Sequence, residues 1–268
     1  MEQFIVTESC ATIRELGRDA LRGRWKLAFI AYTVYSAAVS MPIIFLAAFF
    51  SDGTASAITW IYSTLVTGPL LVGCSIFALS VFRNEEAAVG QIFFGFERFG
   101  KNMGLYIVIS IFIILWALIP VAGIVLAVIA YFRYSQVFFI MADNPDLGIM
   151  ECISRSKQMM AGNKGKYFLL CLSFIGWALL ASLPIIPLEL TAEKVAVSSI
   201  FDLKDAVTFM PSAGYLTAYF VLSAGFYLLT AYVTVSLAAF YEMAAGYLRP
   251  GYIAAKAEII DTDGRENL

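Results

Sequence analysis

Ionisable side chains at the ends of long apolar runs are the first candidates for chemistry in this chain. Arg133 lies one or two helical turns inside the end of one run, and Glu242 lies at the end of the last run. Charged groups in a membrane are costly and often functional, although an Arg side chain also reaches lipid phosphates. We expect both residues at the same membrane face, where Glu242 is the most natural acidic partner for Arg133 in a gate or a structural pair.

Two further candidates lie inside apolar runs. Gly68-Pro69 interrupts the second run. Broken helices with free backbone groups form substrate sites in transporters, but a simple proline kink is the favoured interpretation. Tyr227 lies in the middle of the last run, where a hydroxyl needs a partner. It either lines an internal polar path or, as we favour, bonds to the backbone of a neighbouring helix.

A pair of carboxylates lies in the segment Asp143-Asn144-Pro145-Asp146. Two carboxylates at this spacing are able to bind Mg²⁺ or Ca²⁺. Asp and Asn are also the preferred residues at turns and helix N-caps, and we favour a turn followed by a helix capped by Asp146. The sequence therefore predicts no metal site and no cofactor.

The residue types that most enzymes need are missing. The chain has no histidine, and its four cysteines are far apart in the sequence. No phosphate-binding loop and no Ser/His/Asp set is present. We therefore expect no enzymatic activity and no catalytic residue. A net charge of −2 provides no field that would attract nucleic acid.

The composition explains why apolar runs dominate this chain. Hydrophobic residues make up 60% of it, charged residues only 14%, and the mean hydropathy is +0.80. An apolar run of about 20 residues crosses a bilayer as a helix. The sequence predicts an all-α, polytopic membrane protein in a single domain, with six transmembrane helices at about 27–51, 57–82, 103–119, 121–141, 167–188 and 214–241.

The distribution of basic residues tests the pairing of these helices. Residues 103–141 form either a hairpin that turns at Pro120 or one kinked helix. With the hairpin, every Lys and Arg except Lys194 and Lys204 falls on one side. Without the hairpin, the numbers of Lys and Arg on the two sides of the membrane become nearly equal. Because basic residues collect on the cytoplasmic side, we expect three hairpins and both termini in the cytoplasm of a cell-membrane protein.

Three units follow a similar order along the chain. A short amphipathic stretch comes first (9–22, 87–99 or 146–161), then a glycine beside basic residues, then an apolar run that ends near a proline. The amphipathic helices are expected to lie in the cytoplasmic headgroup layer. The expected contacts with anionic headgroups are Arg22, Arg24, Lys26, Lys101, Lys164 and Lys166. A short outer helix is expected within 189–213.

Several stretches together resemble a known bacterial membrane family. They run from Gly68-Pro69 to Arg83, over 94–96, from 114 to Pro120, over 143–145 and 154–162, and along 172–180. Their combination is similar to the domain of unknown function 975 family of integral membrane proteins, over roughly residues 8 to 245. The family usually has Pro-Gly directly after its apolar run, whereas Pro120 and Gly123 are separated here. The resemblance implies a bacterial plasma-membrane protein without an assigned activity. It also implies a more distant likeness to the membrane region of some glycerophosphodiester phosphodiesterases, although no catalytic domain is present.

Two functions fit these features. The first is non-enzymatic handling or transport of a lipid or hydrophobic solute, which the interrupted second run and Arg133 suggest. The second is a membrane scaffold or accessory subunit that binds anionic lipids and protein partners, which the basic rim and the aromatic residues at 89–99 suggest.

Overall fold

The computed structural model describes residues 4–49, 53–120, 123–190 and 213–248, and these ranges contain helices and no strands. Six of its helical segments are long and apolar enough to cross a membrane, which confirms the all-α class. The short outer helix predicted within 189–213 falls almost entirely outside the described residues.

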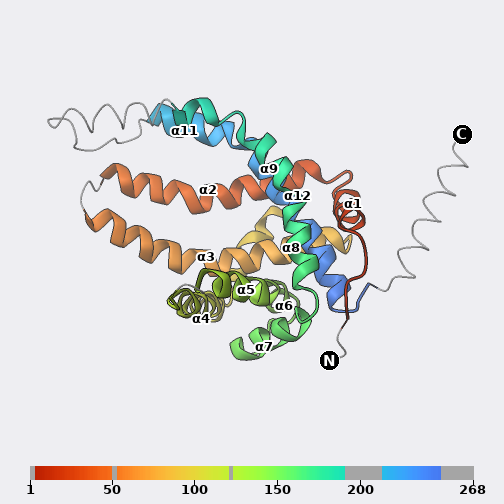
Figure 1. The fold of residues 1–268 in the computed structure, drawn as a ribbon. Helices are drawn as coiled ribbons and strands as arrows, with labels where there is room; N and C mark the ends of the chain where they lie inside the picture. Colours follow the sequence, from red (N-terminus) through yellow and green to blue (C-terminus); the bar gives the residue numbers. More distant parts are fainter. Residues whose placement is uncertain (1–3, 50–52, 121–122, 191–212, 249–268) are drawn as a thin grey trace, which may run out of the picture.

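The helices occur in three successive units, each with one short helix followed by two apolar segments (Figure 1). The first unit contains α1 (Cys10–Ala20), α2 (Trp25–Phe49) and α3 (Gly53–Phe82). The second contains the 3₁₀ helix η1 (Val89–Phe96), α4 (Phe99–Ala117), α5 (Gly123–Tyr134) and α6 (Val137–Asp143). The third contains α7 (Ile149–Met159), α8 (Lys164–Leu172), α9 (Ile175–Ser182), α11 (Ala213–Leu222) and α12 (Ala224–Ala244).

The region around Pro120 reverses the chain, as the charge distribution predicts. Helix α4 ends at Ala117, α5 begins at Gly123, and the two helices pack against each other. A Cβ atom on Gly123 would lie only 2.5 Å from the carbonyl oxygen of Ala117. Glycine is therefore needed at this position for the close approach of the two helix ends.

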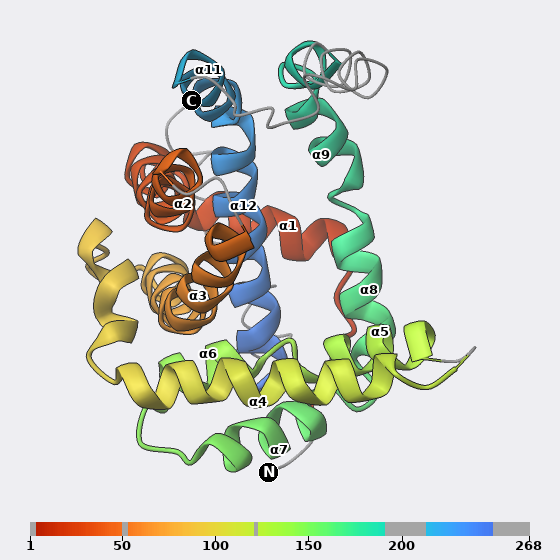
Figure 2. The ribbon, with the colours of Figure 1, turned by 90° about the vertical axis from the view of Figure 1, so that its left-hand side faces the viewer.

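The three units pack in a cyclic order. Helix η1 packs on α3 of the first unit, α7 packs on α5 and α6 of the second, and α1 packs on α12 of the third. Helix α3 also contacts both α6 and α12, so the second apolar segments of the units meet in the interior (Figure 2). Each short helix thus joins its own unit to the one before it.

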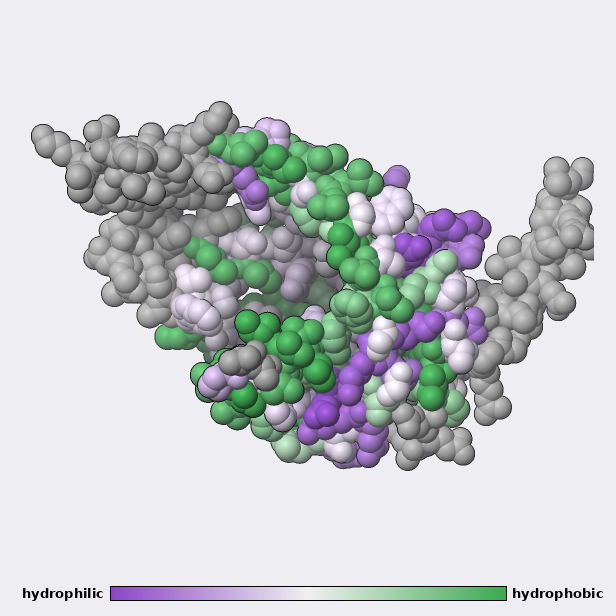
Figure 3. All heavy atoms as spheres, viewed as in Figure 1, coloured by the Kyte–Doolittle hydropathy of each residue, from purple (hydrophilic) through white to green (hydrophobic). Residues whose placement is uncertain are grey.

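Hydrophilic residues are concentrated at one end of the bundle. Figure 3 shows them near α1 and α7, whereas hydrophobic residues cover α9, α11 and the visible parts of α4 and α5. This separation is typical of a helical protein with an apolar zone in lipid and a charged rim at the membrane surface.

The short helices use their apolar residues mainly for packing within the protein. Ile13 in α1, Ile92 in η1 and Ile153 in α7 are completely buried. The apolar faces of these helices therefore pack largely on the neighbouring unit, and their location in the headgroup layer stays a prediction. Phe93 and Phe94 of η1 remain exposed.

Gly68-Pro69 does not break the second span. Helix α3 is continuous across this pair, with Pro69 inside it, which contradicts the less favoured interpretation as a broken helix. A Cβ atom on Gly68 would lie 2.6 Å from the carbonyl oxygen of Asn102 on α4. A Cβ atom on Gly95 would overlap the carbonyl oxygen of Pro69. Gly68 therefore permits α4, and Gly95 permits η1, to pack tightly on α3.

This contact predicts different outcomes for two glycines of η1. The Gly95→Ala substitution places a methyl group against the backbone of α3 and should destabilise the protein by about 1–3 kcal/mol. A Cβ atom on Gly90 would meet no neighbouring atom within 4 Å, so Gly90→Ala is the matched control and should be neutral. Thermal unfolding in detergent measures both. Equal unfolding temperatures for the two variants would contradict the packing described.

Candidate functional site

An ion cluster joins the three units at the charged end of the bundle. The guanidinium Nη1 of Arg83 lies 2.7 Å from Oδ1 of Asp143, and its Nη2 lies 2.7 Å from Oε1 of Glu242. The Nε–H of Arg83 also donates to Oε1 of Glu242, at 2.7 Å. The side chains are 28%, 12% and 7% exposed, in the order Arg83, Asp143 and Glu242. The planar fork of arginine suits this contact with two carboxylates.

The three charged residues of the cluster lie where their helices end. Arg83 follows α3 directly, Asp143 is the last residue of α6, and Glu242 lies in the last turn of α12. Asn84 has a positive φ of 60°, and the N–H of Glu85 donates to the carbonyl oxygen of Ser80 at 2.9 Å. This Schellman motif ends α3 immediately beyond Arg83.

Helix α12 ends in the same way. Gly246 has a φ of 80°, and the N–H of Tyr247 donates to the carbonyl oxygen of Glu242 at 2.9 Å. Two of the three charges therefore lie beside a left-handed residue that ends their helix. The ends of α3 and α12 thus hold the side chains of Arg83 and Glu242 at the same height along the bundle.

Burial alone would lower the pKa of Arg83, but the hydrogen bond to Asp143 and the charge of Glu242 outweigh it, so its pKa is raised. The guanidinium therefore stays protonated and remains a fixed positive charge between two carboxylates. The hydroxyl of Tyr241 donates to Oδ2 of Asp143, at 3.0 Å. The cluster thus has four members from three helix ends.

The predicted pairing of Arg133 with Glu242 is wrong. Glu242 forms its ion pair with Arg83. Arg133 forms no ion pair with any residue that the structure describes. Arg133 lies in the last turn of α5 and is half-buried, with its carbonyl oxygen accepting from the Ser156 hydroxyl at 2.9 Å. Sequence reasoning passed over Arg83 because it stands at the end of an apolar run, in an ordinary flanking position.

The two neighbouring aspartates serve different contacts. Asp143 belongs to the ion cluster, whereas Asp146 accepts from Nη1 of Arg98 at 2.7 Å. This hydrogen bond holds the pKa of Asp146 below its usual range. Asp146 was predicted to cap a helix, but α7 begins three residues later with Gly148 as its N-cap.

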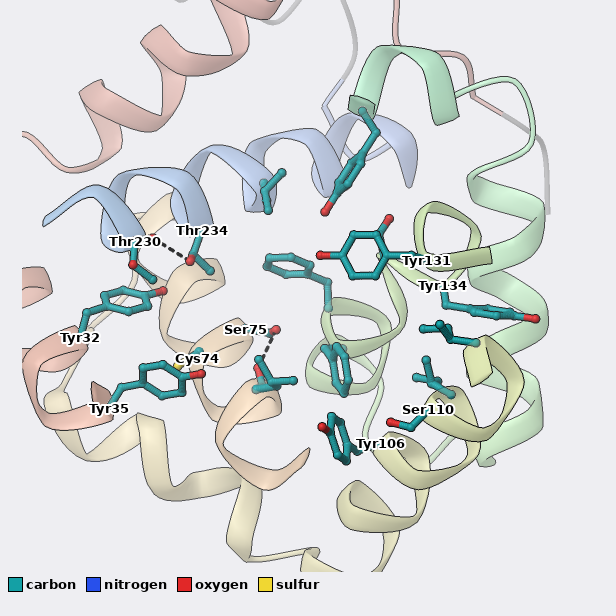
Figure 4. Close-up of a pocket in the computed structure, with 18 residues that line it drawn as sticks. Tyr32, Tyr35, Cys74, Ser75, Tyr106, Ser110, Tyr131, Tyr134, Thr230 and Thr234 are labelled. Carbon is teal, nitrogen blue, oxygen red and sulfur yellow. Dashed lines mark hydrogen bonds between the residues drawn. The ribbon is translucent and has the colours of Figure 1, made fainter. Parts of the chain in front are cut away.

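A cavity of about 320 Å³ lies among the spans. Its lining comes from α2, α3, α4, α5, α6, α8 and α12, so all three units contribute (Figure 4). The hydroxyl-bearing residues of the lining are Tyr32, Tyr35, Ser75, Tyr106, Ser110, Tyr131, Tyr134, Ser135, Tyr167, Thr230 and Thr234. The other lining residues are apolar apart from Cys74, and none of the described lining residues is charged.

Three of these hydroxyl residues have the same sequence spacing from the ion cluster. Ser75, Ser135 and Thr234 each precede the charged residue of their unit by eight positions in the sequence. Eight residues correspond to about 12 Å along a helix. These three hydroxyls therefore lie about two helical turns from the cluster, toward the apolar zone.

A second repeated pattern was visible in the sequence but was missed. Asn102-Met103-Gly104-Leu105-Tyr106 and Asn163-Lys164-Gly165-Lys166-Tyr167 share the order Asn-x-Gly-x-Tyr. Both asparagines are buried, and both tyrosines line the cavity. The amide of Asn102 donates to the carbonyl oxygen of Gly95 at 2.6 Å, and that of Asn163 donates to Met159 and Phe4 at 2.8 Å. The pattern ties each short helix to the span that follows it.

An aromatic pair separates this cavity from a second one. Phe139, which lines the first cavity, stacks on Tyr241 with centroids 5.7 Å apart. Tyr241 lines the second cavity, of about 360 Å³, together with Asn144, Arg155 and Tyr247. Because the Tyr241 hydroxyl is held by Asp143, the ion cluster also fixes the partition between the two cavities.

The hydroxyl of Tyr227 donates to the carbonyl oxygen of Phe220 at 3.1 Å. Phe220 belongs to α11, within the same predicted span 214–241, so this partner does not come from a neighbouring span. Tyr227 is not among the residues that line the cavity.

Three of the basic residues expected at lipid headgroups donate to backbone carbonyl oxygens of the protein. Arg24 donates to Glu85 at 2.9 Å, Lys101 to Pro145 at 2.7 Å and Lys166 to Thr7 at 3.4 Å. Each bond reaches the segment that precedes the next unit in the cyclic order. Arg22 pairs with Asp19, Lys26 is exposed, and Lys164 is half-buried.

Loss of Arg83 leaves two mostly buried carboxylates without their cation. We expect Arg83→Leu to destabilise the protein by roughly 3–5 kcal/mol, since breaking a buried ion pair leaves an uncompensated charge. Arg83→Lys should recover only part of this, because an ammonium cannot reproduce the two-sided fork. Arg133→Leu is the control and should have a small effect. Thermal unfolding in detergent would contradict the assignment if Arg133→Leu were the more damaging change.

The residues that form the ion cluster and the cavity lie within a known family pattern. The family model described as Protein of unknown function (DUF975) matches residues 8–132 and 124–246. No curated protein and no solved structure matches the chain. The two family matches cover α1 to α12, including the ion cluster and the cavity. The chain therefore belongs to the DUF975 family of proteins of unknown function.

Proposed function

We propose that this protein binds a lipid or other hydrophobic solute between its spans and transports it, or otherwise handles it, without chemical change. The observation that supports this most is the cavity of about 320 Å³ to which all three units contribute. Its volume is at the lower end of the range for small-molecule sites, about 300–1,000 Å³. Its lining combines apolar surface with hydroxyl groups, as such sites do.

The lining also supports a non-enzymatic role. Acid–base and nucleophilic catalysis need a positioned base or an activated nucleophile. The described residues of the lining include no carboxylate, imidazole or ammonium group, and Cys74 has no basic neighbour among them. We therefore assign the cavity to binding, with the Phe139–Tyr241 pair as a partition at its charged end.

A scaffold or accessory subunit that binds anionic lipids and protein partners is the second candidate. The exposed rings of Phe93 and Phe94 on η1 and the exposed Lys26 favour it. This function does not need the cavity. Changes that fill the cavity therefore separate the two candidates.

Filling the cavity should abolish solute movement. Ser75→Trp and Ser110→Trp introduce bulk from two different walls, whereas Leu65→Trp places the same residue on the exposed side of α3. In proteoliposomes that contain a fluorescent diacylglycerol or phosphatidylcholine, dithionite quenching reports movement between leaflets. We expect the wild type and Leu65→Trp to move at least one probe and both cavity variants to lose this. No movement of either probe by the wild type would count against the proposal.

We further propose a cell-membrane location, three hairpins and both termini in the cytoplasm. The positive-inside distribution supports this orientation, as does the concentration of hydrophilic residues near α1 and α7 among the described residues. In a chain without its native cysteines, Ser51→Cys should react with a membrane-impermeant maleimide added to intact cells. Arg22→Cys should react only after permeabilisation. The opposite labelling pattern would overturn the orientation.

A further inference from the structure

A short helix and one aromatic ring form the wall between the two cavities. Phe139 of α6 lines the first cavity, whereas Ile140 and Asn144, at the end of the same helix, line the second. The ring of Tyr241 on α12 stacks on Phe139, with centroids 5.7 Å apart and an interplanar angle of 20°. At this point the two cavities are therefore separated by two stacked rings.

Two contacts with α6 hold the Tyr241 ring in this wall. The ring stacks on Phe139, and its hydroxyl donates to Oδ2 of Asp143 at 3.0 Å. Phe139 and Asp143 are four residues apart and so lie on the same face of α6. On the side of the second cavity, Tyr247 meets Tyr241 edge-on, with centroids 6.4 Å apart, and is itself exposed. The closed position of the Tyr241 ring therefore depends mainly on α6.

The second cavity gives the Tyr241 ring room to move. Its volume of about 360 Å³ is within the range that holds a small molecule, and hence an aromatic side chain. Ala244 and Ala245, one turn further along α12, contribute side chains of a single methyl group to the lining. Aromatic side chains on a helix have two common χ1 rotamers, near 180° and −60°. A change between these rotamers moves the ring without a displacement of α12.

The two cavities differ in polarity. The described lining of the first contains no charged residue, whereas the described lining of the second includes Arg155, Asn144 and Gln158. The second cavity also lies at the charged end of the bundle, because Tyr241 directly precedes Glu242 of the ion cluster. A path through both cavities would therefore lead from the apolar zone to the charged rim.

We infer that the two cavities are parts of one solute path and that Tyr241 is the gate between them. The ring closes the path while its hydroxyl is bound to Asp143, and opens the path when it turns into the second cavity. Asp143 is the positioning residue of this gate, and its ion pair with Arg83 connects the gate to the ion cluster. The inference rests on the proposed function, because that function supplies the solute.

Cysteine labelling measures how often the gate opens. In a chain without its native cysteines, Ser110→Cys reports on the first cavity and Ala245→Cys on the second. A charged methanethiosulfonate reagent, which does not cross lipid, is added to membrane vesicles on the side at which Ala245→Cys reacts. With the wild-type gate we expect Ser110→Cys to react slowly from this side.

The Tyr241→Phe variant keeps the ring and removes the bond to Asp143. We expect it to raise the reaction rate of Ser110→Cys about tenfold, which is the population change for the loss of one hydrogen bond to a charged group. Tyr241→Ala also removes the stack on Phe139 and should raise the rate further. Tyr227→Phe is the matched control and should leave the rate unchanged, because it removes a hydroxyl bond on the same helix from a residue outside the described lining of both cavities.

The outcomes separate the gate from the proposed function. Equal rates for the wild type and Tyr241→Phe, with both proteins folded by thermal unfolding in detergent, would overturn the gate and leave Tyr241 as part of a fixed wall. This holds even if Tyr241→Ala reacts faster. The labelling rates do not depend on a solute. A faster reaction of Tyr241→Phe, together with no movement of either lipid probe by the wild type, would instead support the gate and count against the proposed function.

Discussion

One guanidinium group joins the three units of this protein. Arg83 at the end of α3 contacts Asp143 from α6 on one side and Glu242 from α12 on the other. Lipid provides no hydrophobic force that would hold apolar helices together, so polar contacts and close packing must do so. Because the carboxylates are largely buried, loss of Arg83 would leave two uncompensated charges at the point where the three helix ends meet.

The cavity is a consequence of this arrangement. The cyclic packing of the short helices keeps the three units side by side, and glycines such as Gly95 allow the closest of these contacts. The second apolar segment of each unit ends at the ion cluster. The Phe139–Tyr241 pair lies between this cluster and the cavity. Beyond that pair the lining changes to hydroxyl and apolar groups. A solute in the cavity would therefore be shielded from the charged end as long as the cluster is intact.

Hydropathy predicted six helices that are long and apolar enough to cross a membrane, because this property follows from the bilayer and not from tertiary contacts. The side-chain partners of the charged residues were not predicted correctly. Arg133 seemed the best partner for Glu242 on depth alone, but Arg83 has the same depth and a helix end that directs it inward. The close approach of α4 to Gly68 was not predicted, because the sequence does not reveal which neighbour packs against it.

Some of the site was nevertheless present in the sequence. The repeated Asn-x-Gly-x-Tyr pattern and the equal spacing of Ser75, Ser135 and Thr234 from the three charges both needed an alignment of the units to become visible. The packing of the Tyr32 ring against Phe77 and Tyr35 was not visible there, since it joins residues of different helices and neighbouring turns. Such a feature can be found only in three dimensions.

A double-mutant cycle tests most directly whether Arg83 holds the three units together. Unfolding free energies would be measured for Arg83→Leu, Asp143→Asn, Glu242→Gln and their pairs, and for Arg133→Leu with Glu242→Gln. We predict coupling of about 1 kcal/mol or more between Arg83 and each carboxylate, and almost none between Arg133 and Glu242. Coupling of Glu242 to Arg133 and not to Arg83 would contradict the account.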